Sequence, residues 1–225
     1  MKKYFISLLL TCTTSISFSQ IHEIGFFLGG SNYIGDVGNT NYINPNEVGG
    51  GLIYKYNLNP RIALRGTFTY IPISGNDTKA SSPYRKQRGY SFTNTIHEFA
   101  AGIEFNFFEY NIREHKTSFT PYILAEIAVF NYKTIDYITT NNRSIFENTF
   151  SYSIPMGLGV KGRLADNLAY AIESGIRLTF VDNLDYTTDK IARLNFAGTG
   201  NDHYIFTGIS LVYTFGRPPC YAPRE

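Results

Sequence analysis

One Asp–His pair is the best candidate for catalysis in this sequence. His203 directly follows Asp202, and an imidazole beside a carboxylate can act as a general base toward a serine hydroxyl. Ser74 or Ser91, from another expected loop, would supply that hydroxyl in a lipid acyl hydrolase. An Asp–His dipeptide is common in loops, and no His or Cys pair has the spacing of metal ligands. We therefore predict no catalytic residues, no metal and no cofactor, and keep the hydrolase as an alternative.

A second group of charged residues is spaced regularly within apolar segments. Between Phe99 and Phe107 apolar side chains fill every second position, while Glu98 and Glu104 fall on the opposite face of the same strand. The charged residues expected on this enclosed face are Glu23, Lys55, Arg65, Glu98, Glu104, Glu126, Lys161, Glu173 and Arg177. Buried charges are tolerated only when they are paired and hydrogen-bonded, so we predict that these acids and bases interlock.

Eight segments with this alternation must position those charges. The predicted strands are 21–31, 48–58, 61–73, 95–109, 120–132, 150–163, 168–181 and 204–216. Each is long enough to cross a bilayer at the tilt of a barrel strand, and their outward faces carry no charge. An even strand count lets the sheet close without an edge, which lipid requires. The fold class is therefore all-β: an eight-stranded antiparallel outer-membrane barrel with a polar, filled interior and no wide aqueous path.

The connections alternate in length, as they do in outer-membrane barrels. The expected long loops are 32–47, 74–94, 133–149 and 182–203, and the short turns are 59–60, 110–119 and 164–167. Pro155 cannot donate to a sheet ladder, so we expect a bulge there. Arg85, Lys86 and Arg88 form a basic cluster that is either a solvated loop face or a lipopolysaccharide phosphate site. Thr188 is expected to cap a short helix over 189–194.

The N-terminus has the pattern of a secretory signal peptide. Lys2 and Lys3 precede an apolar run, and small residues lead to expected cleavage before Gln20. The alternative is lipidation of Cys12. Thr11 precedes this cysteine where a small Gly, Ala or Ser is usual, and the signal would be very short. The predicted division is a signal over 1–19, a barrel over 20–216 and a C-terminal tail over 217–225.

The composition narrows the possible partners. Of 225 residues, 20 are Lys or Arg and 18 are Asp or Glu, a net charge of +2 that falls to zero when the signal's two lysines are removed. Such a chain offers nothing in bulk that attracts nucleic acid. Cleavage also leaves Cys220 as the one cysteine of an exported chain, so it is either a free thiol or paired with another protein.

Several stretches resemble the PorG family over most of the mature chain. They are Ile21–Gly25, Leu28–Asp36, Tyr54–Arg65, Glu98–Phe107 and Thr120–Tyr122. The resemblance implies an outer-membrane barrel of the type IX secretion system of Bacteroidetes, which in gliding species also serves motility. It implies contact with a periplasmic ring built from a PorK-type lipoprotein and its PorN-type partner, and it implies no catalytic residues.

The partner-binding surface is expected on the periplasmic side, where both termini should lie. The residues expected there are Arg113, Glu114, Lys116, Arg217, Cys220 and Tyr221. The proline-rich tail should be extended and available for docking, and Cys220 is a candidate for an intermolecular disulfide with the ring lipoprotein. The first alternative to this anchoring role is a small barrel that binds a surface ligand or a lipid through its extracellular loops, and the second is the loop-borne hydrolase.

Overall fold

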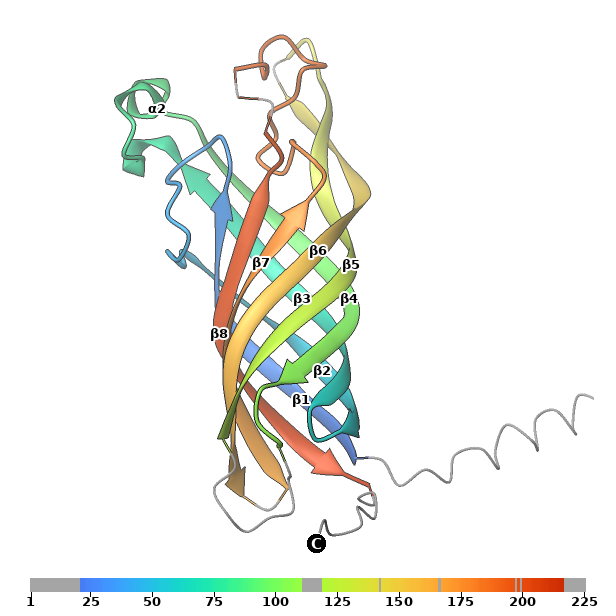
Figure 1. The fold of residues 1–225 in the computed structure, drawn as a ribbon. Coiled ribbons are helices and arrows are strands. Elements are labelled where there is room, and N and C mark those ends of the chain that lie inside the picture. Colours follow the sequence, from blue (N-terminus) through green and yellow to red (C-terminus); the bar gives the residue numbers. More distant parts are fainter. Residues whose placement is uncertain are drawn as a thin grey trace, which may run out of the picture.

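The computed structural model of the chain is a closed antiparallel barrel, and it describes residues 21–110, 119–141, 143–165, 167–196, 198 and 200–216. The strands are β1 Ile21–Ile34, β2 Glu47–Asn59, β3 Ile62–Asn76, β4 Ser91–Asn106, β5 Phe119–Ile138, β6 Ser144–Ala165, β7 Leu168–Thr179 and β8 His203–Phe215. Each strand pairs with the next along the chain, and β1 pairs with β8 to close the ring (Figure 1). The predicted fold class is confirmed.

The alternation along each strand separates an inner from an outer face. In β4, Glu98, Ala100 and Glu104 are buried, whereas Phe99 and Ile103 are exposed. Successive side chains of a strand point to opposite faces, so this pattern places the carboxylates inside the barrel and the apolar side chains outside. Glycine eases the fit at the inner positions: a Cβ on Gly102 would lie 2.1 Å from the carbonyl oxygen of Ala125 on the neighbouring strand.

At the end where β1 begins and β8 ends, short connections join β2 to β3 and β6 to β7 (Figure 1). Between β2 and β3 the Asn59 side chain accepts hydrogen bonds from the backbone N–H groups of Arg61 and Ile62, both at 2.8 Å. This Asn-closed turn is a common way to reverse a chain in two residues. The expected turn at 59–60 is therefore found one residue later, at Pro60 and Arg61.

The opposite end of the barrel departs from the expected loop pattern. Residues 133–149 are predicted as a loop, but they contain the paired end of β5 and start of β6. The two strands join at a turn in which the Thr139 N–H donates to the Arg143 carbonyl at 2.9 Å. This hairpin rises above the other strands (Figure 1). Its sequence is rich in Thr, Ile, Tyr and Phe, a composition that favours strands even without a lipid-facing surface.

Two smaller predictions about the chain were wrong. The register of β5 with β6 is the same on both sides of Pro155, so no bulge forms; the ladder is interrupted between the pairs Ala125–Met156 and Ala128–Ser153. The interruption accommodates the missing proline N–H without an extra residue. Residues 189–194 form turns rather than a helix.

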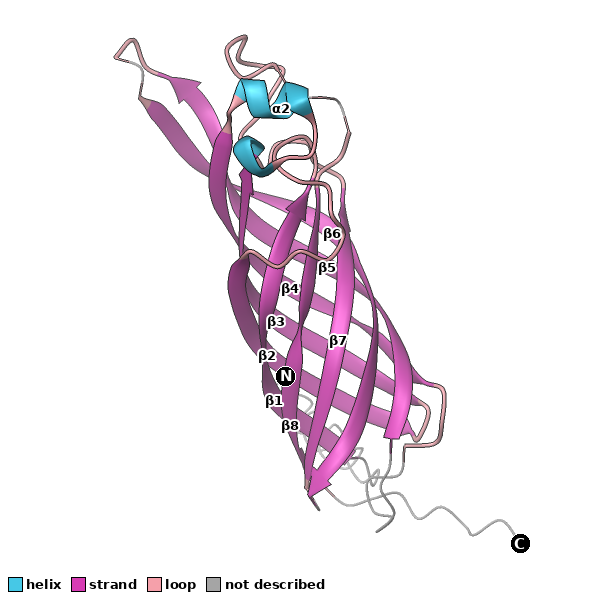
Figure 2. Ribbon diagram, turned by 90° about the vertical axis from the view of Figure 1, so that its left-hand side faces the viewer, coloured by secondary structure: helices cyan, strands magenta, loops and turns pink. Residues whose placement is uncertain are grey.

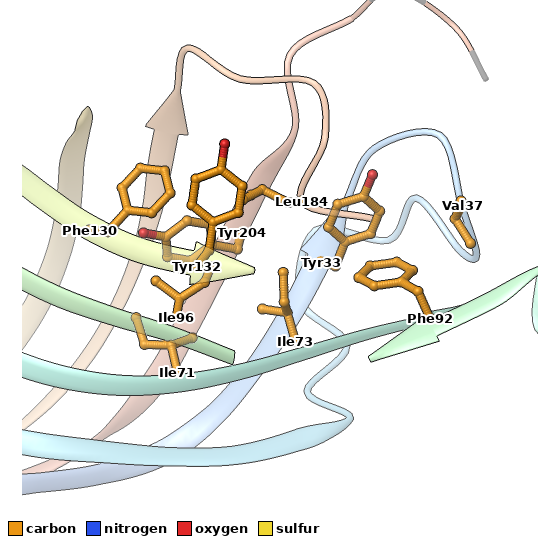
Figure 3. Close-up of a cluster of buried hydrophobic side chains, with 10 residues drawn as sticks. All are labelled: Tyr33, Val37, Ile71, Ile73, Phe92, Ile96, Phe130, Tyr132, Leu184 and Tyr204. Carbon is orange, nitrogen blue, oxygen red and sulfur yellow. The ribbon is translucent and has the colours of Figure 1, made fainter. Parts of the chain in front are cut away.

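Loops cover the mouth at the hairpin end. They include the short helices η1 Asp77–Lys79 and α2 Pro83–Arg88, which lie together above the strands (Figure 2). Beneath them, side chains from several strands pack with Val37 and Leu184 of the loops into a buried apolar cluster (Figure 3). Of the helices in the described ranges, none has the length and apolarity needed to cross a membrane.

Candidate functional site

The barrel interior is organised around the carboxylate of Glu104. Lys55 Nζ lies 2.7 Å from one of its oxygens and Lys161 Nζ lies 2.5 Å from the other. The three residues come from β4, β2 and β6, so the cluster ties together strands that are not neighbours in the sheet. Both lysines also face the ring of Tyr122, at 5.5 and 5.6 Å from its centroid.

A second cluster adjoins the first through Arg65. Its guanidinium binds Glu173 through two N–H groups at 2.5 and 3.0 Å, and it also lies 3.6 Å from Glu104 and 3.7 Å from Glu126. Tyr122 donates its hydroxyl to Glu173 at 2.7 Å. A bidentate pair of this kind holds the guanidinium in one orientation and ties β3 to β7 across the interior.

Glu98 and Arg177 form the third cluster, nearer the capped mouth. Their side chains lie 3.5 Å apart, and Glu98 also accepts hydrogen bonds from Tyr204 at 2.6 Å and from Ser153 at 3.3 Å. At the other end of the interior, Glu23 accepts from Asn57 at 2.9 Å. The structure thus places all nine charged residues predicted for the interior on the inner face.

Sequence reasoning missed the tyrosines that complete these clusters. Tyr122 and Tyr204 sit at inner positions of β5 and β8 by the same alternation that places the charges. Their inward position was therefore available from the sequence. The sequence does not show which carboxylate each tyrosine hydroxyl contacts, because the partners lie on distant strands.

The exterior of the barrel is a broad apolar surface. Large side chains such as Leu52, Phe99, Ile127 and Leu158 are half or more exposed, with Ile127 at 72%. Among the described residues, the outward positions around the middle of the barrel carry no Lys, Arg, Asp or Glu. Charged residues inside and an uncharged apolar surface outside are the arrangement of a membrane-spanning barrel.

Two buried aspartates meet one tyrosine beneath the loops at the capped mouth. The Tyr33 hydroxyl hydrogen-bonds to Asp202 and lies 3.0 Å from an oxygen of Asp185. Asp202 also accepts the backbone N–H of Leu184 at 2.9 Å. Burial, followed by the charge of Asp185, raises the pKa of Asp202 to about 8, so this carboxyl holds a proton at neutral pH.

The basic cluster of the second loop has a structural role that neither interpretation anticipated. Arg88 forms an ion pair with the buried Asp77 at 2.6 Å, and Asp77 also accepts the backbone N–H of Gly38 at 2.8 Å. Arg85 donates to the carbonyls of Gly35 and Gly38. Burial alone would raise the pKa of Asp77, but the hydrogen bonds from Arg88 and Gly38 hold it below its ordinary value. The two arginines thus fasten the second loop onto the first.

The geometry gives little support to the Asp–His catalytic pair. The Asp202 carboxylate is occupied by Tyr33 and Leu184, and His203 Nδ1 is buried without a hydrogen-bond partner. Ser74 and Ser91 line a separate cavity of about 630 Å³ beneath residues 35–46. The Ser74 hydroxyl there accepts a hydrogen bond from Asn46.

The residues predicted to bind a partner fall outside the part of the chain that the structure describes. They are Arg113, Glu114, Lys116, Arg217, Cys220 and Tyr221, and the predicted signal and tail lie outside it as well. Among the described residues, the start of β1 and the end of β8 lie at the same end of the barrel as the β2–β3 turn (Figure 1).

Several solved structures are similar to this chain. Ail of Yersinia pestis shares 15% identity at a TM-score of 0.49, with 88% of this chain and 99% of Ail covered. The N-terminal barrel of OprF from Pseudomonas aeruginosa shares 11% at 0.46, with 88% and 98% covered. A major outer-membrane protein of Thermus thermophilus shares 12% at 0.47, with 87% and 99% covered.

The sequence also matches the model of a protein family. The model of the family described as "Domain of unknown function (DUF6089)" matches residues 2–224. No curated protein matches the chain.

Proposed function

For this chain, which belongs to the DUF6089 family, we propose a structural role: a non-enzymatic barrel that spans the outer membrane and anchors a periplasmic assembly. The filled interior carries this proposal. Lys55, Lys161 and Arg65 converge on Glu104 across the lumen, so the barrel offers no wide path for a solute. A barrel that neither conducts nor catalyses acts through its surfaces.

We infer that the assembly is the periplasmic ring of a type IX secretion system. The resemblance of Ile21–Asp36 and Tyr54–Arg65 to the PorG family supports this proposal. The end where β1 begins and β8 ends would then face the periplasm, in keeping with the usual orientation of outer-membrane barrels. The ring partners would be the PorK-type lipoprotein and the PorN-type subunit, met by Arg113, Glu114 and Lys116 of the turn and by Arg217, Cys220 and Tyr221 of the tail.

Co-purification from native membranes tests the anchoring role. An affinity tag inserted at Asn141, in the turn of the β5–β6 hairpin, leaves the opposite end free. We expect the ring lipoprotein to co-purify in mild detergent, and we expect a double charge reversal, Arg113→Glu with Lys116→Glu, to reduce its recovery. Lys79→Glu, in the cap at the far end, is the matched control and should change nothing.

Two further results would decide the details of this proposal. Absence of the ring lipoprotein under gentle extraction, together with normal protein export in a deletion strain, would overturn the anchoring role. A non-reducing gel tests the disulfide separately, because a covalent complex through Cys220 should disappear with reductant and in Cys220→Ser. A monomer band that reductant does not change would remove the disulfide and leave non-covalent anchoring in place.

The surface-ligand alternative has one observation in its favour. The cavity beneath residues 35–46 is lined by several asparagines, including Asn39, whose Oδ1 is buried without a partner. Amide side chains of this kind can bind a polar ligand. Altered surface binding with intact export in a deletion strain would favour this alternative, and altered lipid A with intact export would favour the hydrolase.

A further inference from the structure

Several strands lack a neighbour on one side near the capped mouth, and β6 does so over a long segment. The ladder between β6 and β7 begins at the pair Ser153–Thr179, where β7 ends, but β6 extends back to Ser144. Within the described part of the chain, Ser144–Tyr152 therefore pairs with β5 alone. This free segment forms one side of the hairpin that rises above the barrel (Figure 1).

The free segment has few of the features that protect sheet edges. Proteins usually guard an exposed edge with lysine, proline or a bulge, because its unpaired backbone groups can accept another strand. Ser144–Tyr152 contains no proline and one charged residue, Glu147. Its register with β5 is regular from Phe146 to Tyr152 and shifts only at the start of the segment, between Ile135 and Tyr137 of β5. Phe146, Phe150 and Tyr152 are exposed by 50%, 71% and 64%. The segment thus presents backbone and apolar side chains together.

A cavity beside this segment determines which charge a bound partner should carry. It has a volume of about 560 Å³ between the inner side of the hairpin and residues 181–198. The charged side chains that line it are Asp136, Glu147, Asp182, Asp189 and Lys190. Acids outnumber bases here, so the cavity favours a cationic occupant.

The electrostatics of Asp182 agree with that preference. Its Oδ1 is buried without a hydrogen-bond partner. Burial, followed by the charges of Asp36, Asp185 and Asp189, raises the pKa of Asp182 to about 6. A cationic side chain placed in the cavity would relieve this repulsion.

We propose that Ser144–Tyr152 accepts an extended, basic segment of a partner protein as an added strand. The incoming segment would continue the β6–β7 ladder above Thr179, at the place in the sheet that β7 leaves empty. Alternate residues of a strand face opposite sides, so its basic side chains would enter the acidic cavity while its apolar ones lie on the side of Phe146 and Phe150. This contact is at the opposite end from the proposed ring anchor and is independent of it.

Hydrogen exchange with a synthetic probe tests the added strand. The probe is an alternating Lys–Val peptide, added to the full mature barrel in lipid nanodiscs. We expect saturable binding and slower amide exchange over Ser144–Tyr152. An alternating Lys–Pro peptide of equal length keeps the charge but lacks half of the N–H donors, and it should bind about tenfold more weakly, because a strand pairs through those donors.

Variants of the cavity test the preference for a basic partner. Removing three charges with Asp136→Asn, Glu147→Gln and Asp182→Asn should weaken binding of the Lys–Val peptide about tenfold, since each exposed charge pair contributes a small factor. Glu109→Gln, at the other end of the barrel and 62% exposed, is the matched control and should have no effect. An alternating Glu–Val peptide should bind more weakly than the Lys–Val peptide.

Four outcomes would overturn the proposal. Equal binding of the Lys–Pro and Lys–Val peptides, or unchanged exchange over Ser144–Tyr152, would mean that the probe adheres by charge alone. Equal binding of the Glu–Val peptide would remove the role of the acidic cavity. Protection of the segment that rises with barrel concentration and without any peptide would assign the edge to a second copy of the chain.

Discussion

Glu104 shows how a membrane barrel can keep ionised groups away from water. Its two oxygens meet Lys55 and Lys161, and Arg65 lies close to the same carboxylate. A charge in this setting has a large desolvation cost that close partners and hydrogen bonds offset. The aromatic ring of Tyr122 beside both lysines adds an uncharged, electron-rich surface to the same cluster. Each member of the cluster therefore depends on the others.

Replacing this carboxylate should destabilise the barrel strongly. In Glu104→Gln the two lysines would face a neutral amide, and breaking a buried ion pair in this way costs about 3–5 kcal/mol. The free energy of unfolding can be measured in lipid vesicles by urea titration followed by circular dichroism, since the chain has no Trp to report on unfolding. Glu109→Gln, which breaks the exposed 3.6 Å pair with Arg61, should change stability by less than about 1 kcal/mol. Equal stability of the two variants would contradict a structural role for the interior cluster.

Asp202 should make the cap at the mouth sensitive to pH. Its folded-state pKa of about 8 is above the ordinary value of about 3.9, so the folded cap favours the protonated carboxyl. Stability of the cap is then greatest in acid and falls as the pH rises from about 4 to about 8. We expect proteolysis within residues 180–202 to be faster at high pH, and this dependence to be lost in Asp202→Asn, which stays neutral. The same pH dependence in the variant would assign the effect to another group.

At the scale of strands and loops, the sequence predicted the barrel better than its ends. The alternation that identifies a strand is sharp where one face meets lipid, as in Phe99–Phe107, and it weakens above the membrane, where both faces of residues 133–149 are mixed. The sequence pattern therefore predicts a loop where the β5–β6 hairpin forms. The side-chain contacts at the capped mouth could not be predicted for a different reason. Tyr33 contacts Asp185 and Asp202, which are far from it in the sequence, and no local pattern encodes such contacts.

The height of the lipid-facing band on β5 and β6 can be tested by introducing an arginine either within the apolar surface or above it. Ile127 lies on the outer face of β5 within the apolar surface, so Ile127→Arg should cost about 2–4 kcal/mol of folding free energy in a bilayer. Asn148 lies on the upper part of β6, beyond the end of β7, and Asn148→Arg should cost little. The folded fraction in vesicles, read from gel mobility without heating, distinguishes the two. Similar losses at both positions would place the hairpin within the membrane.

At the scale of the whole molecule, the two ends of the barrel differ in structure. At one end β1 begins and β8 ends, whereas the other end has a fastened cap and an unpaired segment of β6 (Figures 1 and 2). Between them the ion pairs of the interior join β2, β3, β4, β6 and β7. Such cross-links make the barrel a stiff connector, because strands that are not neighbours in the sheet are held at fixed distances.

That connector should not conduct ions. The Arg65–Glu173 and Glu104 clusters fill the lumen of a barrel whose strand number leaves room for little more than side chains. In planar lipid bilayers we expect the mature protein to show no current steps above baseline, at neutral pH and moderate salt. Removing both partners with Arg65→Ser and Glu173→Ser should admit water and produce small, measurable currents, which also shows that inserted protein would be detected. Large, steady steps from the unchanged protein would mean that the clusters open in a membrane and that the barrel is a pore rather than a purely structural anchor.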